Sequence, residues 1–120
     1  EYIEQNLPLV VTAPPHVMLH GDIHFGNITV SDVSGGLQIA GLFDFADSLL
    51  GSHEYDFLAP GVLMLQGQGE LQRALFRRYG YADAEMDEEM RRRMMMLMIL
   101  YEFSSLRRYA ERLSPEAVDY

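Results

Sequence analysis

The sequence predicts an α+β fold that is mostly helical, in which a short β-hairpin and a polar loop lie against a bundle of helices. Two observations carry this prediction. Residues 27–31 and 37–43 are apolar and β-branched in alternation around the glycine pair 35–36, which is typical of a hairpin. Residues 53–113 instead place apolar side chains at helical spacing in successive runs. The length of 120 residues fits one domain, 1–120.

The chain before the hairpin is expected to pass from helix to strand to loop. Residues 1–7 are interpreted as the last turns of a helix that Pro8 stops, because proline lacks the amide proton that a helix interior uses. Residues 9–15 are expected to be an extended linker, since residues before prolines avoid the helical region. The apolar run 17–19 is interpreted as a strand, and residues 20–26 as a loop.

The predicted hairpin is important because of its two ends. A turn at 32–36 joins its strands, and residues 44–52 after it are expected to be a loop. Asn27 opens the first strand and Asp44 follows the second. Antiparallel pairing brings the two ends of a hairpin together. The sequence therefore predicts that Asn27 and Asp44 lie close in space.

Two helices are expected directly after this loop. The first covers about 53–65, and Pro60 within it is a reason to expect a bend. Residues 67–69 carry two glycines and separate it from the second helix, 70–79. Gly80 is expected to end that helix, because glycine readily adopts the left-handed conformation that follows a helix.

The third helix is expected to be the longest. Asp83 or Asp87 is expected to cap its start. The arginines 91–93 and 107–108 could form an anion-binding patch, but a solvated helix surface is favoured, with ion pairs to acidic neighbours one turn away. Residues 94–100 are all apolar, which predicts burial on most sides. Apolar spacing predicts that the helix continues to Leu113, with a bend at residues 104–105.

The composition excludes several classes of function. A formal net charge of -9 makes nucleic acid and anionic membranes poor partners. The charge would attract a cationic ligand, although solubility alone is the simpler explanation for it. There is no cysteine, which excludes disulfides, thiolate zinc sites and cysteine nucleophiles. No apolar run reaches the roughly 18 residues of a membrane span, and the first residues do not resemble a signal peptide. We therefore expect a cytoplasmic protein.

Three polar residues at the ends of apolar runs favour phosphoryl transfer: Asp22, Asn27 and Asp44. Transfer to an alcohol needs a carboxylate that orients the hydroxyl and accepts its proton, together with metal ions on the nucleotide phosphates. Magnesium prefers oxygen ligands, often one or two carboxylates or amides with water. Each residue alone is more typical of a turn than of a site. The three in this order indicate a site.

Residues 20–27, with the sequence HGDIHFGN, resemble the catalytic loop of the aminoglycoside phosphotransferase and choline kinase superfamily, which are relatives of protein kinases. The family pattern His-Gly-Asp-x-His-x-x-Asn is matched at every fixed position. Residues 43–47 (FDFAD) resemble the metal-binding segment, with Ala46 where many relatives have glycine. Residues 54–59 (EYDFLA) resemble the helix start that follows. The resemblance covers 17–59 and implies the C-terminal lobe of a kinase-like phosphotransferase.

The resemblance also implies roles for single residues. Asp22 is the catalytic base, and Asn27 and Asp44 bind Mg²⁺ and through it the nucleotide. Asp47 lies near the site, either supporting it or facing the substrate. The implied reaction transfers the γ-phosphoryl group of ATP, or GTP, to a hydroxyl of a small cationic molecule such as an aminoglycoside or an amino alcohol. Three further residues support the site structurally: His20, His24 and Asp56.

Half of the implied active site is missing from the sequence. Relatives carry an N-terminal nucleotide-binding lobe with a phosphate-binding lysine, whereas all nine basic residues here are arginine. The chain is therefore expected to begin inside a longer protein and to be inactive alone. The alternative function is a catalytically inactive, truncated module that acts only in self-association or partner binding. An isolated lobe exposes apolar surface, which the missing lobe or a homodimer partner would cover.

Two other kinds of metal site share part of this pattern. Residues 21–27 also resemble the Gly-Asp-x-His-Gly start of metallophosphoesterases. Phe25 interrupts that match, and the later Gly-Asp and Gly-Asn-His clusters of a two-metal site do not follow. Three histidines have the spacing of a helical zinc site, although the prolines and the glycine among them argue against a helix: His16, His20 and His24.

Overall fold

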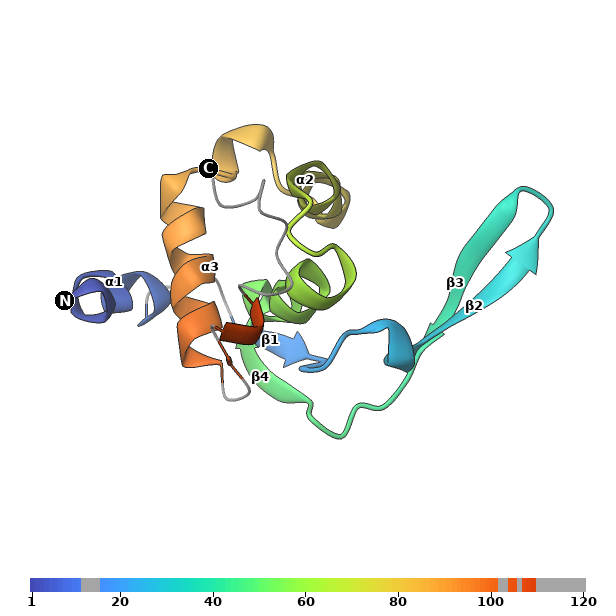
Figure 1. Cartoon of the computed structure of the whole chain (residues 1–120), viewed down its shortest axis with the longest axis horizontal. Helices are drawn as coiled ribbons and strands as arrows, with labels where there is room; N and C mark the ends of the chain where they lie inside the picture. The colour runs from blue at the N-terminus through green and yellow to red at the C-terminus, as the bar shows by residue number, and fades with distance from the viewer. Residues whose placement is uncertain (12–15, 102–103, 106, 110–120) are drawn as a thin grey trace.

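The computed structural model describes residues 1–11, 16–101, 104–105 and 107–109. In this part of the chain the fold is α+β, as the sequence predicts, with helices around one small sheet and a hairpin that projects from them (Figure 1). None of its helices is long and apolar enough to cross a membrane. The elements follow in the order α1 (Tyr2–Val11), β1 (His16–Leu19), η1 (Phe25–Asn27), β2 (Ile28–Val33), β3 (Gly36–Leu42), β4 (Leu49–Ser52), η2 (His53–Phe57), η3 (Pro60–Met64), α2 (Gly69–Tyr79), η4 (Asp83–Glu85) and α3 (Glu88–Leu100).

Helix α1 continues past Pro8 to Val11, so the prediction that Pro8 stops the helix is wrong. Proline removes one hydrogen bond from a helix interior. Helix α1 packs against α3, and Asn6 is buried, with its amide nitrogen donating to the carbonyl of Tyr2 at 2.8 Å. This packing offsets the lost bond. Of the expected linker 9–15, residues 9–11 are therefore helical, and residues 12–15 lie outside the described part of the chain.

Strand β1 confirms the strand predicted at 17–19, and it pairs antiparallel with β4. The second half of the loop expected at 44–52 is therefore a strand, and that prediction is wrong. Gly51 shows why the pairing is close, because a Cβ there would lie 2.9 Å from a methyl carbon of Leu19 on the opposite strand. The pair matters for the site, since β1 leads into the polar loop and β4 leads into η2.

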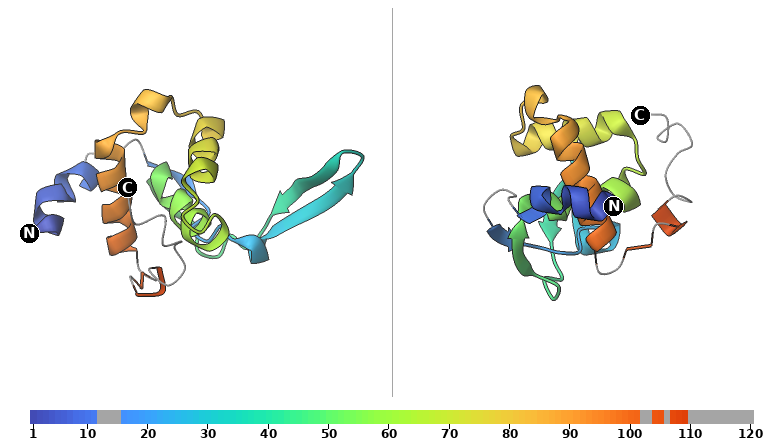
Figure 2. Two further views of the ribbon diagram at one scale, coloured as in Figure 1. Left: turned by 45° about the horizontal axis from the view of Figure 1, so that its top comes forward. Right: turned by 90° about the vertical axis from the view of Figure 1, so that its left-hand side faces the viewer.

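The β2–β3 hairpin is confirmed, with a tighter turn than expected at residues 34–35. Beyond the last paired residues, the amide of Phe43 donates to the carbonyl of Asn27 at 3.1 Å, so the two ends of the hairpin meet as predicted. The hairpin does not lie against the helices but projects from them (Figures 1 and 2). Leu37 and Ile39 are each 73% exposed, because no described element covers the hairpin.

The helical region predicted at 53–65 is confirmed but irregular. Its first part, η2, is a 3-10 helix, and its last part, η3, is a π-helix in which the amide of Leu65 donates to the carbonyl of Pro60 at 2.9 Å. Helix α2 follows, and Gly80 ends it with a φ of 126°, as predicted. The core joins these elements to α3 through the side chains of Phe57, Phe76 and Met90.

Asp87 caps α3, because its carboxylate accepts a hydrogen bond from the amide of Met90 at 2.9 Å. The helix ends at Leu100, so the prediction of one continuous helix to Leu113 is wrong. Residues 107–109 form a separate helical turn, and residues 110–120 lie outside the described part of the chain. Ser104 explains the end, since its hydroxyl donates to the carbonyl of Ile99 at 3.3 Å. The burial predicted for residues 94–100 is confirmed in part: Met96 and Leu97 are buried, whereas Met95 is 45% and Leu100 is 50% exposed.

Candidate active site

The carboxylate of Asp56 on η2 fixes the start of the polar loop. It accepts the amide of His20 at 2.9 Å and the amide of Gly21 at 2.8 Å. The ring of His20 is buried, and its Nδ1 accepts the amide of Asp22 at 3.2 Å. Nε2 must then carry the proton that it donates to the carbonyl of Phe43 at 2.9 Å. His20 and Asp56 thus hold the loop through its backbone, in the supporting positions expected of them.

Gly21 brings the loop into backbone contact with the segment after the hairpin. Its φ of 85° lies in the left-handed region, which side chains rarely adopt. A Cβ at this position would clash with the carbonyl oxygen of Asp47 and lie 3.2 Å from a methyl carbon of Leu49. Only glycine fits here without strain.

Replacing Gly21 with alanine is expected to lower the free energy of unfolding by about 2–5 kcal/mol, combining a left-handed backbone with overpacking. Urea unfolding followed by circular dichroism measures the loss. Gly35→Ala is the matched control, because Gly35 also has a positive φ, 128°, but has open space around it. The control should lose only about 1–2 kcal/mol. Equal losses in the two variants would show that the contact with Asp47 contributes nothing.

The side chain of Asp22 is held at one oxygen. Oδ2 accepts the amide nitrogen of Asn27 at 3.2 Å, and that nitrogen also donates to the carbonyl of Asp22 at 3.0 Å. Nε2 of His24 lies 3.3 Å from the same Oδ2, while its Nδ1 accepts the amide of Gly26 at 2.9 Å. His24 therefore donates from Nε2 as a neutral ring. The Asp22 side chain remains 34% exposed, so its carboxylate is oriented yet accessible.

Asp44 lies two residues after β3, at the end of the hairpin opposite its turn. It is exposed and has a φ of 64°, a left-handed conformation that is uncommon outside glycine. Both of its neighbours are anchored on His20: the carbonyl of Phe43 accepts the ring Nε2, and the ring of Phe45 lies 4.5 Å from the imidazole. Such strain persists where the surroundings hold it, and it is common at functional sites.

The residues at the ends of the hairpin offer oxygen donors of the kind that Mg²⁺ prefers. The nitrogen of the buried Asn27 amide is committed to Asp22, which leaves its carbonyl oxygen for a ligand, and Asp44 adds a carboxylate. Two such oxygens completed by water are a common magnesium site. The described residues contain no group of three histidine, cysteine or acidic side chains that could hold a metal ion. The alternative zinc site is therefore not formed at His16, His20 and His24.

A cleft of about 470 Å³ opens beside Asp22. His24 and Asp47 line it with Asp22, and apolar side chains after η2, including Leu58 and Val62, form another part of its lining. The structure therefore brings three of the expected site residues to one cleft. The other expected residues lie outside its lining: His20, Asn27, Asp44 and Asp56.

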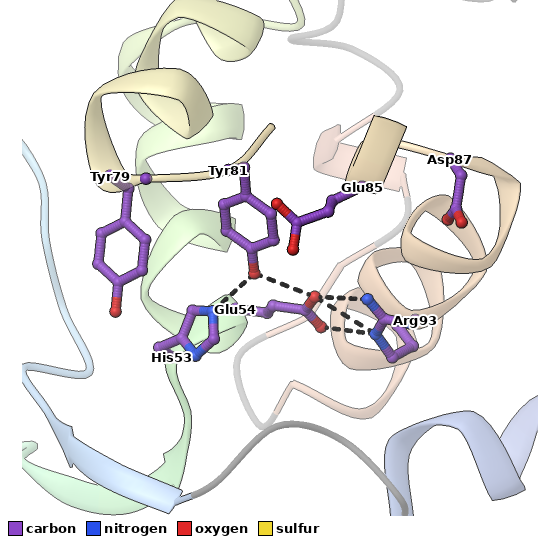
Figure 3. A pocket seen from close by; sticks show the side chains of 8 residues that line it. His53, Glu54, Tyr79, Tyr81, Glu85, Asp87 and Arg93 are labelled. Atoms are coloured by element: carbon purple, nitrogen blue, oxygen red, sulfur yellow. Dashed lines mark hydrogen bonds and ion pairs between the residues drawn. The ribbon is translucent and has the colours of Figure 1, made fainter. Parts of the chain in front are cut away.

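Sequence reasoning missed a buried ionic network next to the site (Figure 3). Glu54 is fully buried. Arg93 on α3 donates two hydrogen bonds to its carboxylate, from Nη2 to Oε1 at 2.9 Å and from Nε to Oε2 at 3.0 Å. The hydroxyl of Tyr81 donates to Glu54 at 3.2 Å and lies 2.6 Å from Nε2 of His53. Figure 3 shows these side chains converging from three segments.

The network changes the interpretation of α3. The hydrogen bond to Glu54 raises the pKa of the Arg93 guanidinium. Burial, and then the charge of Glu54, raises the pKa of Tyr81. Arg93 is only 15% exposed, so the prediction of a solvated surface at 91–93 is wrong at this position. Since η2 also carries Asp56, it connects α3 with the polar loop.

One comparison with known proteins identifies a relationship. The model of the phosphotransferase enzyme family (APH) matches residues 1–95. The matched range contains the polar loop, the hairpin and η2, and it ends within α3. No curated protein and no solved structure matches the chain.

Proposed function

Because the chain belongs to the phosphotransferase enzyme family, we propose that residues 1–120 are the C-terminal catalytic lobe of an ATP-dependent small-molecule kinase. The reaction transfers the γ-phosphoryl group of ATP, or GTP, to a hydroxyl of a small acceptor with a cationic group, such as an aminoglycoside or an amino alcohol. One observation carries the proposal. The Asp22 carboxylate is oriented through Oδ2 and faces a cleft large enough for a small molecule.

Asp22 acts as the base in this proposal. Its oriented carboxylate accepts the proton of the acceptor hydroxyl, as phosphoryl transfer to alcohols requires. Asn27 and Asp44 hold Mg²⁺, which neutralises charge on the nucleotide phosphates when bound. Asp47 adds a second carboxylate to the cleft and attracts a cationic group of the acceptor.

His20 and Asp56 keep the loop in place without contacting the acceptor. Their hydrogen bonds go to backbone groups, and neither residue lines the cleft. His24 both lines the cleft and contacts Asp22, so it orients the base directly. In this proposal hydrogen bonds hold the loop in place, and the cleft beside Asp22 stays accessible to the acceptor.

An N-terminal lobe supplied by a longer parent protein completes the proposed site. Within the described residues, large apolar side chains stay exposed near the site and on the hairpin, including Met18 at 71%, Phe25 at 69% and Leu50 at 74%. Such exposure favours a partner surface. The same observation supports the second candidate, an inactive module that uses this surface for self-association or for binding another protein.

The chain alone is expected to show no turnover and no tight nucleotide binding. The test is calorimetric titration with ATP and Mg²⁺, together with phosphoryl transfer from radiolabelled ATP to kanamycin, choline and ethanolamine. The parent protein with its N-terminal lobe should transfer phosphate to an acceptor of this class. Turnover by the 120 residues alone would contradict the need for a second lobe. An inactive parent and a concentration-dependent dimer in light scattering would favour the second candidate.

A further inference from the structure

The cleft beside Asp22 carries charges of both signs. Asp22 and Asp47 reach it from the loop and from the segment after the hairpin. Arg108 and Tyr109 reach it from the separate turn at 107–109. A pocket for a purely cationic acceptor needs no guanidinium in its lining, because like charges repel.

Hydrogen bonds hold the backbone of the turn that carries Arg108 and Tyr109. Ser105 organises the turn, since its hydroxyl accepts the amide of Arg108 at 3.4 Å and its carbonyl accepts the amide of Tyr109 at 2.9 Å. Burial raises the pKa of Tyr109, so its hydroxyl keeps its proton near neutral pH and can donate it in a hydrogen bond. The two side chains therefore offer adjacent donors.

Arg108 differs from the arginines of α3. Arg91, Arg92 and Arg93 each lie within 3.4 Å of a carboxylate oxygen. Among the ion pairs of the described residues, the Arg108 guanidinium has no carboxylate partner. A guanidinium binds carboxylate and phosphate groups through paired hydrogen bonds. Arg108 thus adds to the cleft lining a cationic residue for which the described residues supply no carboxylate partner.

We infer that the acceptor is zwitterionic: besides its hydroxyl and its cationic group it carries an acidic group, a carboxylate or a phosphate, which Arg108 and Tyr109 bind. The inference rests on the proposed function and narrows it. The hydroxyl lies at Asp22, and the cationic group lies near Asp47. Amino alcohols and aminoglycosides without an acidic group are then poorer acceptors than hydroxylated amino acids or their phosphate analogues.

Three probes with one carbon skeleton test this inference on the full 120-residue chain. L-serine carries a carboxylate, 2-amino-3-hydroxypropyl phosphate carries a phosphate, and serinol carries neither. Two-dimensional NMR titration measures the dissociation constants. At least one acidic probe should bind tenfold or more tightly than serinol, and the tighter of the two identifies the acidic group.

The variant Arg108→Gln should reduce this preference to about onefold while serinol binding stays unchanged. Arg92→Gln, on the exposed face of α3, is the matched control and should keep the preference. Equal binding of all three probes, no binding of any, or a preference that survives in Arg108→Gln would overturn the inference. Failure of the proposed function is separate, because it appears as an inactive parent protein.

Discussion

Replacing Glu54 with glutamine is expected to lower the free energy of unfolding by up to about 3–5 kcal/mol, because the Arg93 guanidinium then keeps only the exposed carboxylate of Glu89, at 3.1 Å, as a counter-charge. Glu54 is fully buried and Arg93 is 15% exposed, so water cannot take over the role of the carboxylate. The glutamine has nearly the same shape and adds no cavity. Urea unfolding of the purified chain measures the difference.

Glu88 provides the matched control for this result. It also pairs with an arginine of α3, Arg92, at 3.4 Å, but both side chains are more than half exposed. Exposed pairs of this kind contribute about 0.2–1 kcal/mol. Glu88→Gln should therefore change stability by less than about 1 kcal/mol. A double variant, Glu54→Leu with Arg93→Met, should recover part of the loss. If Glu54→Gln and Glu88→Gln lowered the free energy of unfolding by equally small amounts, the buried pair would have no structural role.

Replacing Asp22 with asparagine in the parent protein is expected to lower kcat by about 10²–10⁴-fold, since the variant cannot accept the proton of the acceptor hydroxyl. The amide keeps an oxygen that can accept from Asn27 and His24, so the loop geometry should survive. KM for the acceptor should change little, because the loss falls on the reaction rather than on binding. Steady-state kinetics with the preferred acceptor measure both constants.

Asp32→Asn serves as the control for Asp22→Asn. Asp32 lies on the exposed hairpin strand β2 and outside the cleft, so its removal should leave kcat unchanged. An Asp22→Asn enzyme that keeps more than about a tenth of the wild-type kcat would remove Asp22 from the role of base. A parallel loss in both variants would indicate damage to folding, which circular dichroism detects.

The proposed site depends on a relay of contacts from α3 to the polar loop. Arg93 holds Glu54 on η2, and two residues later Asp56 holds the backbone amides of His20 and Gly21. The loop then presents its carboxylate to the cleft.

Local features of the structure follow from the sequence. Asp87 caps α3 and Gly80 ends α2, because capping and left-handed termination depend on residues within one turn. The hairpin and the meeting of its ends at Asn27 and Phe43 follow from alternation around a glycine turn. Membership of the phosphotransferase enzyme family agrees with the resemblance of residues 20–27. The roles of the site residues stay predictions.

Other features depend on partners far away in the sequence, and only the tertiary structure decided them. Helix α1 continues through Pro8 because it packs on α3, and residues 49–52 become a strand because β1 is available to pair. Glu54 pairs with Arg93, which is 39 positions away in the sequence, and no local pattern predicts this pair. Local hydrogen bonds and the alternation of apolar residues depend on neighbouring residues. Side-chain burial and strand pairing depend on which distant segments pack together. The residue types of the polar loop can therefore be recognised in the sequence, whereas its cleft and its anchorage on Asp56 depend on the tertiary structure.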